Sequence, residues 1–205
     1  MPVSRPRDTR DRILRTAADL LGAGGLDAVT FDSVASRLGV TKQAVIYWFP
    51  SKVALLSELA LPGLQNEARA AIDAAQSASS MAGAAQAVVR AITAFHMADL
   101  PRFRLMYLAP QISTHAEARR TAAELMKQIH PVTAEMYSAI ATALGNGPRA
   151  RETAVALHMA ALGHVLMVAL TDAIDDPLRQ APDILAVRLA SVLAVGVEYE
   201  TGESS

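Results

Sequence analysis

The stretch covering residues 30–52, TFDSVASRLGVTKQAVIYWFPSK, constrains the fold more than any other part of the chain. Its spacing predicts two short helices, residues 32–38 and 42–49, joined by a tight turn at Gly39. Glycine suits the end of the first helix because it adopts a left-handed conformation at little cost. Small and apolar residues surround the turn, as the crossing of two helices requires: Val34, Ala35, Leu38, Val40, Val45 and Trp48. The pattern predicts a helix-turn-helix.

Two threonines and three polar residues make this motif a candidate DNA reader. Thr30 and Thr41 precede the two helices, where a hydroxyl accepts hydrogen bonds from the unpaired N–H groups of a first turn. With the apolar residues inward, Lys42, Gln43 and Tyr47 face outward on the second helix, as recognition of a major groove requires. Lysine and glutamine reach base edges, and tyrosine reaches a phosphate or a thymine methyl.

The exit from the motif supplies a further candidate contact. After Phe49-Pro50, Ser51 is placed to cap another helix, with Lys52 in its first turn. Backbone N–H groups and an ammonium then point toward any phosphate near that end, so Lys52 is a predicted phosphate contact. Pro62-Gly63 follows within this helix and predicts a break or a kink. The sequence leaves open whether this defect transmits a signal or is only a helix boundary.

The N-terminus predicts a short arm followed by a one-sided helix. Residues 1–10, with Arg5, Arg7 and Arg10, are expected to form a basic arm, flexible over residues 1–9, that enters a minor groove or remains a solvated tail. Apolar residues then repeat at intervals of three and four over residues 8–21, and the helix is expected to end at the glycines of residues 22–25.

The same residues resemble a known family. The run GVTKQAVIYWFPSKVALL, preceded by ILRTAADLLGAGG and TFDSVASRL, is similar to the N-terminal DNA-binding domain of TetR-family transcriptional regulators over residues 10–56. The sequence departs from the family at Ile46 and Trp48, where an aromatic residue and a histidine are expected. The resemblance implies a homodimer that binds a palindromic operator, with a C-terminal domain that binds a small effector.

Charge and composition fit a DNA-binding domain that is joined to a second domain. Residues 1–52 hold eight Lys and Arg against five Asp and Glu, whereas residues 53–205 hold eleven against fifteen. The predicted DNA-binding domain therefore carries a net positive charge, which agrees in sign with phosphate binding. The chain has no cysteine, which excludes disulfides and thiolate metal sites, and it begins with no secretory signal. We expect a cytoplasmic protein.

The remainder of the chain is rich in alanine and predicts only helices. We expect an all-α fold, with a three-helix helix-turn-helix domain over residues 1–52 and a helical ligand-binding and dimerisation domain over residues 53–205. Prolines, glycines and serines mark the breaks. The expected helices cover residues 64–78, 81–98, 102–108, 115–129, 132–144, 149–174 and 183–199, and the fourth and fifth of these could form one helix kinked at Pro131.

The last two long helices are apolar and rich in small residues, which allow helices to approach closely. We expect them to meet a second copy in a two-fold four-helix interface, as the resemblance implies. The predicted interface residues are Ala156, Ala160, Gly163, Val187, Ala190 and Ala194. Two alternatives remain: an intramolecular core, and a membrane span over residues 153–171. The histidines, the glycine and the many alanines of that stretch favour a buried helix over a membrane span.

Polarizable and polar residues on the middle helices predict an adaptable pocket, because methionine and aromatic side chains line cavities with few polar groups. The predicted effector is small and mostly apolar or aromatic, with one or two hydrogen-bonding groups. The predicted lining is His96, Phe103, Met106, Tyr107, Met126, His130, Tyr137, His158 and Met159.

Catalytic and metal motifs are missing from the sequence. His158 and His164 are six residues apart, no HExxH spacing occurs, and a metal would need His96, His130 and His158 to converge. We therefore expect no enzyme activity, no cofactor and no metal. The sequence predicts a ligand-responsive transcriptional regulator, a repressor that binds a duplex DNA operator as a homodimer and is released by its effector. The alternative is a helical binding or scaffold protein without a role at DNA.

Overall fold

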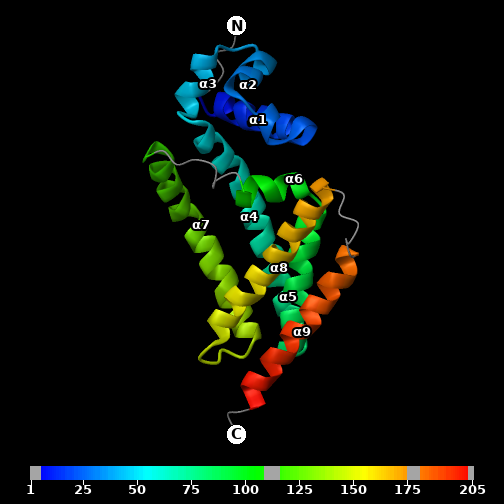
Figure 1. Cartoon of the computed structure of the whole chain (residues 1–205). Helices are drawn as coiled ribbons and strands as arrows, with labels where there is room; N and C mark the ends of the chain where they lie inside the picture. The colour runs from blue at the N-terminus through cyan, green and yellow to red at the C-terminus, as the bar shows by residue number, and fades with distance from the viewer. Residues whose placement is uncertain (1–5, 109–115, 175–180, 203–205) are drawn as a thin grey trace. The chain divides into compact units, whose positions relative to one another are not determined.

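The structure is a computed structural model that describes residues 6–108, 116–174 and 181–202 (Figure 1). Within these ranges all regular structure is helical and no strand occurs, which confirms the predicted all-α fold. The chain forms two compact units, one from residues 1–64 and 101–129 and the other from residues 65–100 and 130–205. The predicted functional boundary at residue 52 stays a prediction, and each unit is described by itself.

The first unit begins with three helices: α1 (Pro6–Ala28), α2 (Phe31–Leu38) and α3 (Lys42–Trp48). The helical backbone of α1 is interrupted at Gly24 and at Gly25, which has φ 68°. The regular helix therefore stops within the predicted glycine run. The start differs from the prediction, because residues 6–9 belong to α1 and do not form an arm. Residues 1–5 lie outside the described residues.

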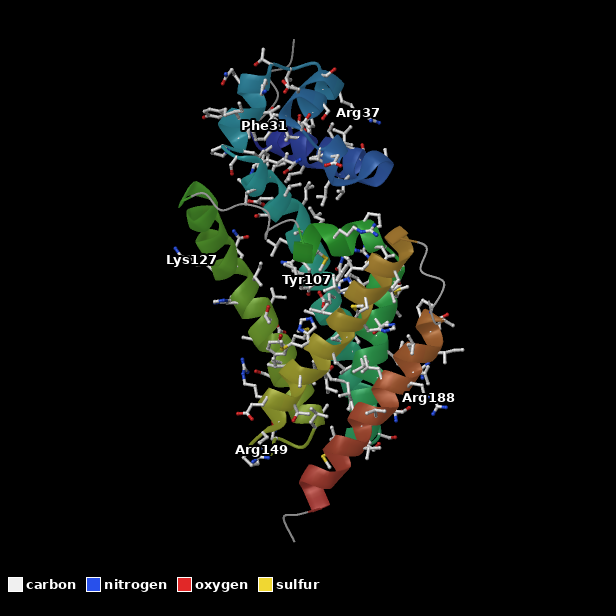
Figure 2. The ribbon with its side chains drawn as sticks, viewed as in Figure 1. Phe31, Arg37, Tyr107, Lys127, Arg149 and Arg188 are labelled. Atoms are coloured by element: carbon white, nitrogen blue, oxygen red, sulfur yellow. The ribbon has the colours of Figure 1, made fainter. Side chains whose placement is uncertain are left out.

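A core of large apolar side chains holds the first unit together. Its fully buried members include Ile13, Val34, Val45, Phe49 and Leu55. The residues predicted to surround the turn all belong to this core, with Val34, Ala35 and Val45 buried and Leu38, Val40 and Trp48 partly buried against them. Phe31 packs partly buried against the same core, and Arg37 extends from α2 at the surface (Figure 2).

The helix α4 (Lys52–Gln76) continues through the predicted break. Pro62 lies inside this single helix and is exposed, although proline lacks the N–H group that would bond within the helix. Gly63 is buried, and a Cβ added there would lie 2.7 Å from the sulfur of Met106. The glycine thus permits close packing of the short segment formed by α6 (Leu100–Phe103) and the π-helix η1 (Arg104–Leu108).

The second unit is built around α5 (Met81–Met97), which packs against α8 (Ala150–Ile174) and α9 (Pro182–Gly202). The C-terminal halves of α4 and α7 (Ala116–Ala143) complete its core. Many of the buried residues are alanines, which lets these helices pack closely. The two helices predicted over residues 115–144 form the single helix α7, with Pro131 inside it.

Candidate functional site

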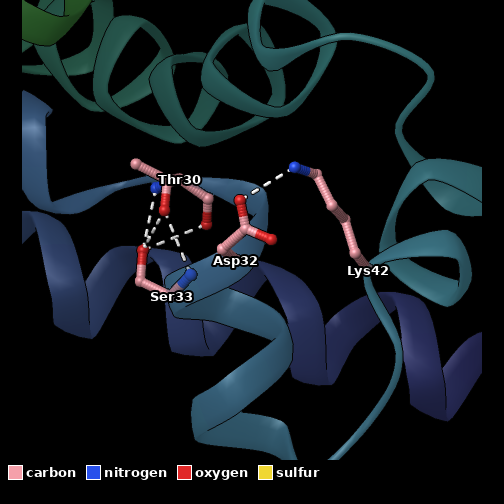
Figure 3. A network of polar contacts seen from close by, with 4 residues as sticks. All are labelled: Thr30, Asp32, Ser33 and Lys42. Atoms are coloured by element: carbon pink, nitrogen blue, oxygen red, sulfur yellow. Dashed lines mark hydrogen bonds and ion pairs between the residues drawn. The ribbon is translucent and has the colours of Figure 1, made fainter.

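The turn between α2 and α3 is fixed by its predicted caps. The hydroxyl oxygen of Thr30 accepts from the backbone N–H of Ser33 at 3.0 Å, and the N–H of Thr30 donates to the Ser33 hydroxyl at 3.0 Å (Figure 3). Thr41 accepts from the N–H of Ala44 at 3.2 Å. Gly39 has φ 68° and ψ 35°, the left-handed conformation that the sequence predicted. These bonds set the direction in which α3 leaves the turn.

The exposed face of α3 carries the residues predicted to read DNA. Lys42 and Gln43 are exposed, and Tyr47 is 78% exposed although its ring is large and mostly apolar. Val45 lies on the opposite face and is fully buried, so it anchors the helix to the core. The ring of Trp48 meets that of Tyr47 edge to face at 5.2 Å. The face is free for a partner, and its contacts with DNA stay a prediction.

Two lysines near this face have partners within the chain. The Lys42 ammonium donates to a carboxylate oxygen of Asp32 at 2.8 Å. The Lys52 ammonium donates to the backbone carbonyl of Leu26 at 3.1 Å, which ties the start of α4 to the end of α1. Ser51 accepts from the N–H of Ala54 at 3.1 Å and caps α4 as predicted. Lys52 therefore has a structural contact in addition to its predicted role at phosphate.

Arg10 is a packing residue of α1 and not part of a mobile arm. Its guanidinium lies 5.3 Å from the centroid of the Phe49 ring and forms an ion pair with Glu58 at 2.6 Å. It thereby links α1 to the end of α3 and to α4. The minor-groove interpretation is wrong for Arg10, while Arg5 and the side chain of Arg7 lie outside the described residues.

Three of the predicted pocket residues converge in the second unit on a carboxylate that sequence reasoning missed. Glu67 is 2% exposed, and its Oε1 lies 2.8 Å from Nε2 of His158 and 3.3 Å from Nε2 of His96. The Tyr137 hydroxyl lies 2.8 Å from Nδ1 of His158. We refer to these four residues as the polar cluster.

The electrostatics of the polar cluster favour an ionised Glu67. Burial acts to raise the pKa of Glu67, but hydrogen bonds from His158 and His96 outweigh it and lower the pKa to about 2, so the group is ionised. An ionised Glu67 accepts from Nε2–H of His158, and the other ring nitrogen, Nδ1, is hydrogen-bonded to the Tyr137 hydroxyl. Burial, with the charge of Glu67, raises the pKa of Tyr137 against the opposing effect of Arg151.

The helical spacing of α4 could have revealed Glu67. Small or apolar residues recur along one face of this helix at intervals of three and four, and Glu67 occupies a position in that series. A glutamate on the buried face of an apolar helix requires partners, because an unpaired buried charge is costly. The residues that share its face are Ala60, Leu64, Ala71 and Ala75.

The other predicted pocket residues lie elsewhere. Phe103 and Met106 are buried in the first unit, and the ring of Phe103 lies 5.5 Å from that of half-buried Tyr107. Met159 is 66% exposed on α8 and His130 is exposed on α7, because both side chains lie on the outer faces of their helices. Neither belongs to an enclosed site in this chain. The side chain of Met126 lies outside the described residues.

The described residues include no group of three or more His, Asp or Glu side chains that could hold a metal ion. His130 is exposed and does not join the two histidines of the polar cluster. The expected absence of a metal, a cofactor and a catalytic activity stays a prediction.

Small residues of α8 and α9 divide between the core and the surface. Ala190 and Ala194 are buried in the chain's own core, so their side chains do not face a second copy. Ala156, Gly163 and Val187 are exposed, and Ala160 is half-buried. A groove of about 310 Å³ between the two helices includes Ala156 in its lining. Of the predicted interface, only the residues outside the core remain available for contact.

The surface of these two helices is strongly apolar. Large side chains are exposed on α8 and α9: Met159, Met167, Leu170, Ile184, Leu185, Val187, Val192 and Val195. We refer to this set as the apolar face. By length and composition alone, residues 150–171 could cross a membrane. Of the 18-residue apolar stretch that meets this criterion, 39% is buried within the chain. Such a helix is equally typical of a subunit interface.

A capped helix-turn-helix with an exposed polar second helix defines this chain as a helix-turn-helix protein of the DNA-binding class. Residues 13–59 match the family model of bacterial regulatory proteins, tetR family. Residues 13–59 of this chain therefore form a DNA-binding domain of the TetR-family type. Members of the family are DNA-binding transcriptional regulators that respond to ligands.

Individual relatives agree with this assignment. An uncharacterized HTH-type transcriptional regulator of Bacillus subtilis, YdeS, is 43% identical over 56 residues, which is 26% of this chain and 28% of that protein. A tetR-family regulatory protein from Rhodococcus RHA1 is 20% identical, with 92% of this chain and 96% of that chain covered and a TM-score of 0.59. A TetR variant from Acinetobacter baumannii AYE, solved with minocycline, is 18% identical, with 91% and 94% covered and a TM-score of 0.62. These two structures are similar to the chain in fold.

Proposed function

We propose that this protein is a transcriptional repressor that binds a palindromic operator as a homodimer and is released from it by a small effector. The observation that carries the proposal is the outward face of α3. Lys42, Gln43 and Tyr47 are exposed there, while Val45 anchors the helix to the core from behind. This arrangement presents hydrogen-bonding groups to base edges without exposing the core of the unit.

The apolar face supports the homodimer. Many large apolar side chains exposed on two neighbouring helices are typical of an interaction site, and a second copy would bury the same residues on both partners. A dimer would place two α3 helices about 34–36 Å apart, one turn of duplex DNA, and would select a palindrome. Occupancy of such a site would block transcription. We place this activity in the cytoplasm, where the DNA of a bacterial cell lies.

The polar cluster supports an effector that is mostly apolar or aromatic and carries one or two hydrogen-bonding groups. Tyr137 is half-buried, and its hydroxyl, hydrogen-bonded to His158, retains capacity for a further hydrogen bond to an effector. The relative from Acinetobacter baumannii was solved with minocycline, an observation on that protein which agrees with effector binding in this fold.

The helix α4 is the proposed route from effector to DNA. Its Leu55 is buried in the core of the first unit, and its Ala68 and Ala71 are buried in the core of the second. No loop interrupts α4 between these residues, which makes this helix the candidate for carrying the change. An effector shifts the population toward release only by as much as it prefers the released state.

A selection from randomised duplex DNA tests the proposal. The full-length protein should enrich a palindromic sequence, and binding to that sequence should weaken steeply with salt because bound phosphates release counterions. Lys42→Ala and Gln43→Ala should lower operator affinity by the equivalent of about 1–3 kcal/mol each and relax selectivity at particular positions. A protein that enriches no sequence and binds duplex DNA at no salt concentration would instead be the scaffold protein of the alternative.

A further inference from the structure

The ion pair between α2 and the recognition helix α3 suggests an additional function for an acidic residue. Figure 3 shows the Lys42 ammonium directed toward Asp32, with 2.8 Å between Nζ and Oδ2. The two side chains are 50% and 70% exposed, so both are accessible to a partner. Lys42 is among the residues proposed to contact DNA, and the pair therefore places a carboxylate on the DNA-facing surface.

The position of Lys42 explains why a carboxylate is useful there. Lys42 is the first residue of α3, and the N-terminal end of a helix carries partial positive charge that disfavours an ammonium. The first turn of α3 has no acidic residue of its own. Asp32, in the first turn of α2, supplies the missing negative charge from a position that also suits a carboxylate.

Asp32 is held in place by the backbone around it. It lies between Thr30 and Ser33, whose side chains and backbone N–H groups bond reciprocally at the start of α2. The Ser33 hydroxyl also donates to the carbonyl of Ala28 at 2.7 Å. The carboxylate therefore projects from a fixed turn, and Lys42 is the flexible partner.

We propose that Asp32 is a specificity-determining residue. Its carboxylate pairs with Lys42 in place of a DNA phosphate, and Lys42 leaves this ion pair only when it contacts the matched base edge. This inference rests on the proposed DNA-binding function. A duplex without the matched base must compete with Asp32 for Lys42. An exposed ion pair is weak, so a good base contact displaces it easily. Asp32 thus lowers affinity for unmatched DNA more than affinity for the operator.

Fluorescence anisotropy with the full-length protein tests this role. The two probes are a labelled 30-base-pair duplex of mixed sequence and the operator recovered by selection. Asp32→Asn should bind the mixed duplex about 3–10-fold more tightly near 0.1 M salt, with a salt slope steeper by about one, because Lys42 gains a phosphate contact. Operator affinity should change less, so the ratio between the two affinities should shrink.

Two further variants separate this role from a general charge effect. Asp19→Asn removes the same charge from an exposed position on α1 and should change both affinities little. In a Lys42→Ala background, Asp32→Asn should produce no larger gain than Asp19→Asn. The inference is overturned if Asp32→Asn matches Asp19→Asn in the wild-type background, or if its full gain persists without Lys42. If the wild-type protein binds neither duplex, the proposed function fails and this inference fails with it.

Discussion

Replacing Glu67 with glutamine would remove a buried charge from the second unit while preserving the shape of the side chain. The two imidazole nitrogens that approach Oε1, at 2.8 Å from His158 and 3.3 Å from His96, would then face a neutral amide. A charged acceptor forms stronger hydrogen bonds than a neutral one. The substitution should therefore destabilise the fold most at a pH where this carboxyl is ionised in both the folded and the unfolded chain.

The expected magnitude follows from the pKa of Glu67. Burial acts to raise this pKa and the hydrogen bonds from His158 and His96 lower it, and the result is a fall from 4.5 to about 2. A group whose pKa is lowered by folding stabilises the protein above its unfolded pKa, and this contribution is lost as the pH falls through the folded value. The difference corresponds to about 3 kcal/mol at neutral pH, as an order of magnitude.

Urea denaturation followed by circular dichroism at 222 nm measures this contribution. We expect Glu67→Gln to lower the free energy of unfolding by about 3 kcal/mol at pH 7 but by only about 1 kcal/mol at pH 3, where the unfolded carboxyl is largely protonated. Glu135→Gln, at an exposed position of α7, is the matched control and should have little effect at either pH. Equal losses at pH 7 and pH 3, or no loss at pH 7, would refute the reasoning.

Other substitutions probe the remaining features. Tyr47→Ala should weaken operator binding in anisotropy titrations while leaving the thermal midpoint nearly unchanged, because the ring is 78% exposed. Gly63→Val should lower the free energy of unfolding by about 1–3 kcal/mol, because the added side chain overlaps Met106. Pro62→Ala should raise the free energy of unfolding by up to about 3 kcal/mol, because alanine has the better helix propensity. A stabilising Gly63→Val together with a destabilising Pro62→Ala would contradict this description of the packing. Val192→Glu, at a side chain that is 70% exposed, should yield a folded monomer in sedimentation equilibrium, and an unchanged dimer would place the interface elsewhere.

Local rules predicted the helix-turn-helix well. Thr30, Thr41 and Gly39 act through bonds within three to five residues, so their roles follow from the sequence around them. The continuity of α4 through Pro62 was not predictable in this way, because an exposed proline is tolerated when the rest of the helix is held by packing at both ends.

The polar cluster was predictable only in part, because it depends on contacts between distant segments. His158 and Glu67 are 91 residues apart, and no local pattern pairs them. Apolarity alone also misplaced residues on helices that are apolar on every side. Met159 and Ala190 have similar surroundings in sequence, yet the first is exposed and the second is buried, since only tertiary packing decides which face turns inward.

Trp48, the chain's single tryptophan, gives the recognition helix its own spectroscopic signal. The indole is partly buried in the core of the first unit and meets the Tyr47 ring edge to face at 5.2 Å. Emission excited at 295 nm therefore arises from α3 alone, without any label, while far-ultraviolet ellipticity averages over all helices. Unfolding of the first unit can therefore be followed separately from unfolding of the rest of the chain. Stopped-flow mixing with duplex DNA or with an effector would show in real time when α3 changes its surroundings.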